Sequence, residues 1–219
     1  MFVGHYSAAL AAKAIEPRAP LWTLVAGCQL IDIGWSVLVM AGVEKLRIDP
    51  SLPGSSLDLY SMPYTHSLPA VLVWTIAAIA LSRYVLKLPW WPAVIIGLTV
   101  FSHWVLDYLV HRPDLLVWPG YPKVGLGWWN YPVPEQALEI GLLGLAGMAW
   151  AWRRDSSGDG WLRPLTFFTA LVALQVAVMF MSPEKDPYQM GLSALLVYLI
   201  VTAVAWVIDR GPKKAGRRR

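Results

Sequence analysis

The chain has 219 residues, of which 57% are hydrophobic and only 15% are charged, and its mean hydropathy is +0.49. This composition is too apolar for an ordinary soluble domain and indicates an integral membrane protein. The formal net charge of +4 does not indicate a nucleic-acid partner, because six of the eighteen basic residues lie within the last ten positions. A basic end of this kind is typical of a cytoplasmic tail beside anionic lipid.

Taken in order, six runs of the chain are long enough to cross a bilayer, which requires about 20 apolar residues. They are 21–43, 66–86, 91–111, 134–152, 165–181 and 188–208. Before them, the apolar segment 2–15 is short for a span, and it predicts an inserted or re-entrant helix. The sequence therefore predicts an all-α fold, a polytopic transmembrane helical bundle. Residues 1–209 form its single domain, and 210–219 form a basic cytoplasmic tail.

The basic residues predict how this bundle is oriented. If the connections alternate between the two sides, one side carries thirteen of the Lys and Arg residues and the other carries five. The positive-inside rule places the richer side, with the C-terminus, in the cytoplasm. The long connections 44–65 and 112–133 then face outward. We expect a multi-pass membrane protein.

The third run ends in an unusual polar stripe. Residues four apart share one face of a helix, so His103, Asp107 and His111 project from the same side of an otherwise apolar segment. An ionisable side chain at membrane depth costs at least a few kcal/mol by insertion scales, and it normally faces the bundle interior with a partner nearby. The stripe predicts a functional site.

Other polar residues are expected at a similar depth. At a rise of about 1.5 Å per residue, His5, Asp32 and His103 lie roughly 16 to 18 Å from the cytoplasmic boundary, and His66 and Asp107 about 24 to 25 Å. Imidazoles and carboxylates are the ligands expected for Zn²⁺ and related divalent ions. We therefore predict a divalent metal centre, with Zn²⁺ as the expected ion. Its candidate ligands are His5, Asp32, His66, His103 and Asp107.

The fourth run adds two carboxylates near its outer end, Glu135 and Glu139, again four apart. Either is a candidate general base or ligand-orienting group beside a metal, and we favour Glu139. The fifth and sixth runs contain no His, Asp or Glu until Asp209. We expect these two runs to form a packing surface or a contact with a membrane-protein partner.

Three motifs carry a resemblance to a family. Gly4-His5-Tyr6, Pro63-Tyr64-Thr65-His66-Ser67-Leu68 and Ser102-His103-Trp104-Val105-Leu106-Asp107 resemble elements of bacterial inner-membrane proteins classed as membrane-bound, metal-dependent hydrolases. The resemblance covers roughly the first 150 residues, and 123–130 is similar to one branch of the family. In that family the Thr-His-Ser and Ser-His-x-x-x-Asp elements are taken as metal-binding. The resemblance thus implies that His66, His103 and Asp107 bind metal, with His5 as the N-terminal histidine.

One departure from the family bears on the number of metal ions. Many relatives carry a Pro-Asp-x-Asp element in the second apolar segment, whereas this chain has only Asp32 there. A single carboxylate leaves one ion or two open.

The leading prediction for function is metal-dependent hydrolysis of a lipid-linked or membrane-proximal ester, including phosphoesters, at a site toward the outer face. Membrane lipid and a lipid-like substrate are then the expected partners. His111 and Arg112 are candidate substrate contacts, because an arginine can bind a phosphate. Two other classes stay open. The same residues could relay protons or pass an ion. The chain could also be a non-catalytic subunit of a larger membrane complex, or a haem protein using His66 and His103.

Overall fold

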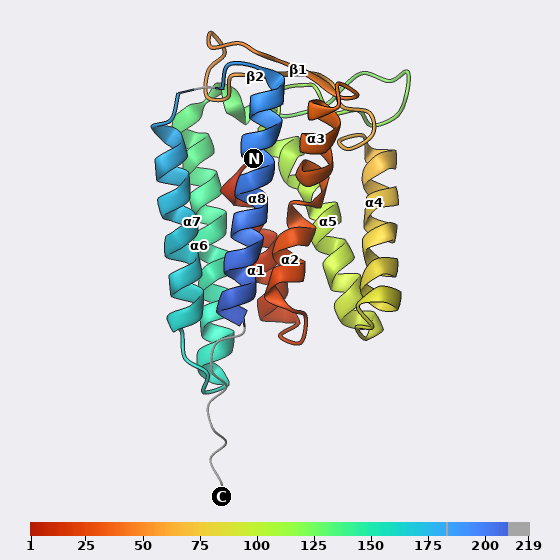
Figure 1. Cartoon of the computed structure of the whole chain (residues 1–219). Coiled ribbons are helices and arrows are strands. Elements are labelled where there is room, and N and C mark those ends of the chain that lie inside the picture. The colour runs from red at the N-terminus through yellow and green to blue at the C-terminus, as the bar shows by residue number, and fades with distance from the viewer. Residues whose placement is uncertain (183, 210–219) are drawn as a thin grey trace, which may run out of the picture.

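The structure, a computed structural model, describes residues 1–182 and 184–209 (Figure 1). Its eight α-helices are α1 (Tyr6–Ile15), α2 (Leu21–Cys28), α3 (Leu30–Met40), α4 (Leu68–Ala80), α5 (Trp90–Val110), α6 (Pro132–Ser156), α7 (Leu162–Met179) and α8 (Pro187–Asp209). Short 3₁₀ turns precede α1 (η1, Val3–His5) and α6 (η3, Trp128–Asn130), and a π-helical turn continues α4 (η2, Leu81–Val85). The predicted tail, 210–219, lies outside the described residues.

The helices confirm the predicted bundle in its main character. Four are long and apolar enough to cross a membrane, namely α4 with η2, α5, α7 and α8. The pair α2 and α3 is bent by 51° and passes the same test if it is taken as one broken span. Helix α6 is the longest, at 25 residues, but it carries charged residues near both ends and is not among these. The number of six spans stays a prediction.

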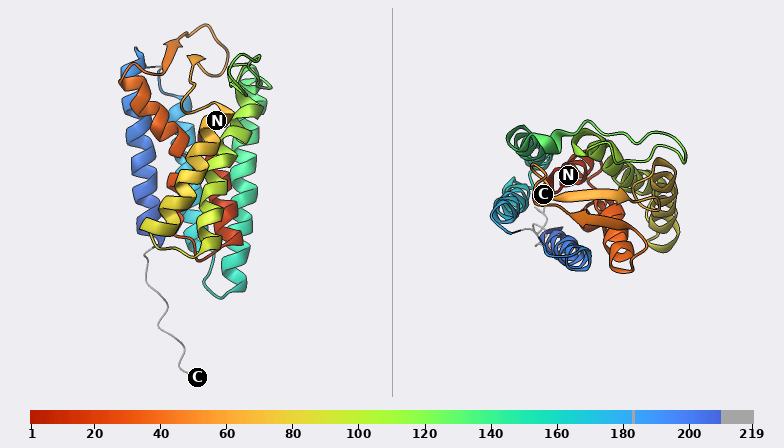
Figure 2. Two further views of the ribbon diagram at one scale, coloured as in Figure 1. Left: turned by 90° about the vertical axis from the view of Figure 1, so that its right-hand side faces the viewer. Right: turned by 90° about the horizontal axis from the view of Figure 1, so that it is seen from above.

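One element was not expected in an all-α fold. Strands β1 (Lys45–Ile48) and β2 (Leu57–Ser61) form an antiparallel hairpin, so the molecule is helical with a small two-stranded sheet. The strands alternate in the usual way, since Leu46 and Leu59 are buried whereas Lys45 and Arg47 are exposed. Figure 2 shows the hairpin lying across one end of the bundle, beside the connection between α5 and α6. Together these segments, 44–65 and 112–131, cover that end, and we refer to them as the cap.

Three apolar clusters lie along the bundle. The smallest joins α3, α4 and α5, and the predicted site falls between the other two. One is built mainly on α1, α2, α6 and α7 and includes Leu10, Leu24 and Phe167. The other lies under the cap. On α5 the first cluster takes Ile96 and the second takes Val110, so His103 and Asp107 come at the intermediate level.

A break in the second apolar run shapes this level. Helix α2 ends at Cys28 and α3 begins at Leu30, with Gln29 in a non-helical conformation between them. Gly27 allows α2 to lie close to α5, because a Cβ atom added there would be 2.6 Å from Thr99 Oγ1. Helix ends carry carbonyl groups without an intrahelical partner. The break therefore presents backbone carbonyls of α2 to α5 in the middle of the bundle.

Candidate metal centre

Six titratable side chains from four parts of the chain meet at this level. They are His5 in η1, Asp32 in α3, His66 before α4, His103 and Asp107 in α5, and His111 at the end of α5. All six are buried, with at most 9% of the residue exposed. The structure thus brings together the five predicted metal ligands and adds His111, which was predicted only as a substrate contact.

Four donor atoms lie at distances expected of zinc ligands along four of the six edges between them. Asp32 Oδ1 lies 3.3 Å from His66 Nε2 and 3.4 Å from His103 Nε2. Asp107 Oδ2 lies 3.5 Å from His66 Nε2 and 3.1 Å from His103 Nε2. Four ligands at about 2.0–2.1 Å from Zn²⁺ in a tetrahedron are about 3.3–3.4 Å from one another. The four measured edges lie close to this value, and we call these four atoms the frame.

Hydrogen bonds do not account for the close approach within the frame. His103 Nε2 and Asp107 Oδ2 are 3.1 Å apart and buried, yet neither atom makes a hydrogen bond within the described residues. Buried polar atoms are nearly always hydrogen-bonded, so each exception requires an explanation, and an ion is one of the ordinary ones. A group of lone-pair atoms facing one point is the arrangement that a metal ion requires.

The opposite side of each frame histidine is held by an acceptor. His103 Nδ1 lies 2.8 Å from the carbonyl oxygen of Cys28, the residue at the break between α2 and α3. A carbonyl only accepts, so Nδ1 donates and the Nε2 atom that faces the frame is left with its lone pair. This is the tautomer that a metal-binding histidine needs, and such outer contacts are typical of metal sites.

A short relay does the same for His66. Thr65 Oγ1 donates to Glu44 Oε2 at 2.6 Å, and it lies 2.8 Å from His66 Nδ1. Because the hydroxyl proton is committed to the carboxylate, His66 Nδ1 is the donor to Thr65 and His66 Nε2 again presents a lone pair. The same carboxylate also accepts the backbone N–H groups of Tyr64 and Thr65. The cap thereby orients one ligand of the frame.

The last helix also contributes to the centre. The phenol of Tyr198, in α8, donates to Asp32 Oδ2 at 2.9 Å and leaves Oδ1 for the frame. The prediction that the last two runs serve only as packing or partner surface is therefore incomplete. That the last two runs contact a membrane-protein partner stays a prediction.

The two glutamates of α6 are buried, and their carboxylates already accept hydrogen bonds. Glu139 accepts the backbone N–H groups of Phe2 and Gly4 at 2.8 to 3.0 Å and so holds the turn that carries His5. Glu135 accepts from the side-chain amide of Gln136. The role of either residue as a general base stays a prediction, and what the structure shows for Glu139 is a positioning contact.

Arg112 lies in the cap and points away from the frame. Its guanidinium donates to the carbonyls of Pro53, Ser55 and Leu57 and to the side chain of Asn130. Partial burial lowers the pKa of Arg112 from its usual value. These contacts tie the hairpin to the α5–α6 connection, and the predicted contact with substrate stays a prediction.

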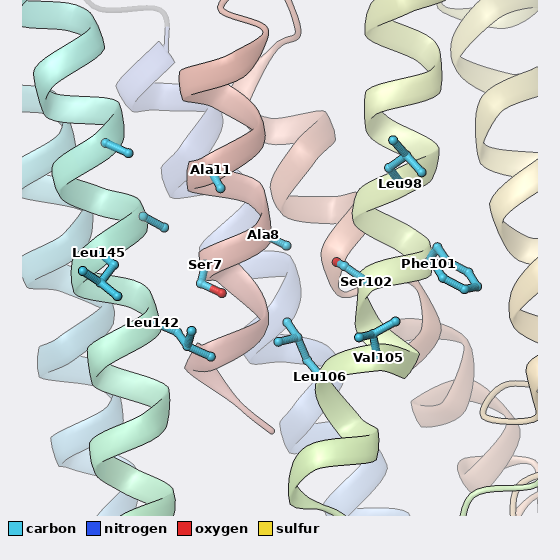
Figure 3. Close-up of a pocket in the computed structure, with 12 residues that line it drawn as sticks. Ser7, Ala8, Ala11, Leu98, Phe101, Ser102, Val105, Leu106, Leu142 and Leu145 are labelled. Atoms are coloured by element: carbon cyan, nitrogen blue, oxygen red, sulfur yellow. The ribbon is translucent and has the colours of Figure 1, made fainter.

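An apolar groove of about 550 Å³ lies on the far side of α5 from the frame residues. In Figure 3, Ser7, Ala8 and Ala11 of α1 lie between Leu142 and Leu145 of α6 and the side chains of α5. Ser7 and Ser102 are the hydroxyl-bearing residues of its lining. None of the frame residues lies in the wall of the groove.

Comparisons with protein-family models, with curated proteins and with solved structures gave no match. The resemblance to membrane-bound hydrolases rests on the three motifs alone. Function is therefore argued from the residues of the site.

Proposed function

We propose that this chain is a membrane-embedded, metal-dependent hydrolase in which His66, His103, Asp32 and Asp107 hold a divalent ion, with Zn²⁺ as the first candidate. The observation that supports it best is the frame, whose four edges of 3.1 to 3.5 Å suit ligands arranged tetrahedrally around zinc. His5 and His111 lie next to the frame, on the other oxygen of Asp107.

Charge supports a cation in the frame. Asp32 and Asp107 are buried in the bundle, and a buried carboxylate is stable only when it is paired or coordinates a metal. The contacts on His66 Nδ1 and His103 Nδ1 favour neutral rings that face the frame with lone pairs. Two carboxylates and two neutral imidazoles carry two negative charges. The amino group of Met1, 2.9 Å from Asp107 Oδ1, balances one of them, and the other favours a cation in the frame.

A zinc ion held in this way acts as a Lewis acid toward an ester or phosphoester. The chain itself supplies the rigid support that such chemistry needs. Tyr198 fixes Asp32, Cys28 fixes His103, and Thr65 fixes His66, each through one hydrogen bond.

The substrate class we propose is a lipid-linked or membrane-proximal ester or phosphoester. The groove along α1 supports this choice, because it is apolar and is lined in part by α5, the helix that also carries His103 and Asp107. Its volume of about 550 Å³ lies within the usual range for ligand sites, about 300–1,000 Å³. A hydrocarbon chain is the occupant that a membrane supplies at this depth.

Metal analysis of the purified protein tests the first half of the proposal. The wild type should carry about one or more equivalents of zinc, and His103→Ala and Asp107→Ala should carry far less. Ser102→Ala is a matched control, because Ser102 precedes His103 on α5 but bonds only the Thr99 carbonyl. Equal and negligible metal in all four proteins would overturn the proposal.

Hydrolysis assays test the second half. Reconstituted protein is given short-chain and long-chain esters and phosphoesters, with and without a chelator. We expect chelator-sensitive hydrolysis that His103→Ala abolishes. A protein that binds zinc fully but hydrolyses none of these substrates would retain the metal site and lose the enzyme assignment.

A further inference from the structure

The second oxygen of Asp107 faces its own group of donors. Oδ2 belongs to the frame, whereas Oδ1 lies 3.0 Å from His5 Nε2 and 3.2 Å from His111 Nε2. The two oxygens of one carboxylate therefore face two separate sets of imidazoles. The sets come from different parts of the chain, since His5 belongs to η1 and His111 ends α5.

The donors on the Oδ1 side also present lone pairs. His111 Nδ1 lies 2.8 Å from Asp114 Oδ1, and a carboxylate only accepts, so Nδ1 donates and, in the neutral ring, Nε2 carries the lone pair that an ion requires. The ring of His5 is fully buried, and neither of its nitrogens makes a hydrogen bond within the described residues. That ring is stacked on His103, with 3.8 Å between the ring centroids, which fixes its plane.

The local charge exceeds what one divalent ion balances. Besides Asp32 and Asp107, the carboxylates of Asp114 and Glu139 lie beside His111 and the His5 turn, and both are largely buried. In the described part of the chain, no Lys or Arg forms an ion pair with any of the four; the amino group of Met1, 2.9 Å from Asp107 Oδ1, is the cation there. One divalent ion and this amino group together balance three of these four negative charges, so one negative charge remains.

We propose that Asp107 Oδ1, His5 and His111 hold a second divalent cation, so that Asp107 bridges two ions. This inference rests on the proposed function for the first ion and deepens it. Paired ions about 3.5–4 Å apart are a recurrent hydrolytic arrangement, in which both ions stabilise the oxygens of one displacement. His111 thereby becomes a metal ligand, and Asp114 becomes the residue that orients it.

Metal titration is the direct test. The protein is stripped with a chelator, Zn²⁺ is added back, and the bound zinc per chain is measured after removal of free ion. The wild type and Ser102→Ala should bind about two ions. His111→Ala and His5→Ala should bind about one, and Asp107→Ala, which loses the bridge, should bind less than either.

A spectroscopic measurement separates two adjacent ions from two distant ones. Loaded with Mn²⁺, the wild type should give an exchange-coupled electron paramagnetic resonance spectrum, and His111→Ala should give the spectrum of an isolated ion. Asp114→Ala leaves every ligand in place and should weaken only the second ion, by about 10- to 100-fold, as is usual for residues that orient a metal ligand.

The outcomes distinguish this inference from the proposed function. One ion per wild-type chain that His5→Ala and His111→Ala both retain would overturn the second site and leave the frame intact. No ion in the wild type would overturn both. If either histidine variant fails to fold, Asp114→Ala decides, because unchanged affinity for both ions in that variant contradicts the second site.

Discussion

The polar centre and the apolar groove share one element, α5, and differ in nearly every other respect. The centre gathers titratable side chains whose outer atoms are fixed by Thr65, Cys28 and Tyr198. The groove is lined by alanine, leucine and other small or apolar side chains. Ser102 and His103 are consecutive on α5, yet one lines the groove and the other belongs to the frame. The contrast teaches that a single helix can separate a charged site from hydrocarbon by about one residue of rotation.

The largest effect should come from removing a frame ligand without touching the groove. Asp32→Ala takes away one of four donors and leaves Tyr198 without its acceptor. We expect zinc affinity to fall by more than about 100-fold, since even residues that only orient ligands contribute about 10- to 100-fold. Zinc competition with a chelator measures this. Asp58→Ala, an exposed carboxylate of the hairpin, is the control, and equal losses in both variants would contradict a specific role for Asp32.

A smaller effect is expected from the contact behind His66. Thr65→Val keeps the shape of the side chain but removes the hydroxyl between Glu44 and His66. Zinc affinity should fall by about 10- to 100-fold while the ligands stay present. The same titration measures it, with Ser67→Ala as a neighbouring hydroxyl variant. Unchanged affinity in Thr65→Val would show that the tautomer of His66 is fixed in some other way.

Filling the groove should affect substrate and spare the metal. Ala11→Trp places an indole in the groove wall, so hydrolysis of long-chain esters should fall about tenfold, equivalent to about 1.4 kcal/mol. Short-chain esters and zinc content should be unaffected. Ala77→Trp, on an exposed position of α4, is the matched control. Equal loss of activity on short-chain and long-chain esters would contradict the proposal that the groove binds the hydrocarbon chain of the substrate.

The smallest effect is expected from a substitution in the α1–α2 connection, outside both the centre and the groove. Arg18 donates to the Glu16 carboxylate in the α1–α2 connection, and its own side chain is 67% exposed. That contact lowers the pKa of Glu16 from its usual value. Exposed pairs contribute about 0–1 kcal/mol, so Arg18→Ala should lower the free energy of unfolding by less than about 1 kcal/mol and leave zinc and activity unchanged. Denaturant titration checks this, and a larger loss would make the connection a structural element in its own right.

The centre was predictable from the sequence as far as helical periodicity and depth extend. The spacing of His103 and Asp107 places them on one face of α5, and simple counting brings His5 and Asp32 to a similar height. These four, with His66, do meet in the structure. The counting cannot reveal which nitrogen of each ring faces inward, because that depends on contacts made across the chain.

The missed contributors share a cause. Cys28 acts through its backbone carbonyl at a helix break, and Glu44 acts through a cap whose hairpin was not recognised. Two signals were present: Lys45-Leu46-Arg47-Ile48 alternates in the manner of a strand, and Tyr198 is a polar tip within a long apolar run. Neither a strand pattern nor a lone tyrosine suggests a metal site by itself. The roles of these segments are visible only from their tertiary contacts.

The fastening of the cap has a consequence for the timing of metal uptake. Four hydrogen bonds from Arg112 tie the hairpin to the α5–α6 connection above a centre in which no residue is more than 9% exposed. An ion in such a chamber exchanges with bulk solution only when that fastening opens. If the proposed ion is bound there, the folded protein should release it slowly, and loading should be most efficient while the chain is still being assembled into the membrane.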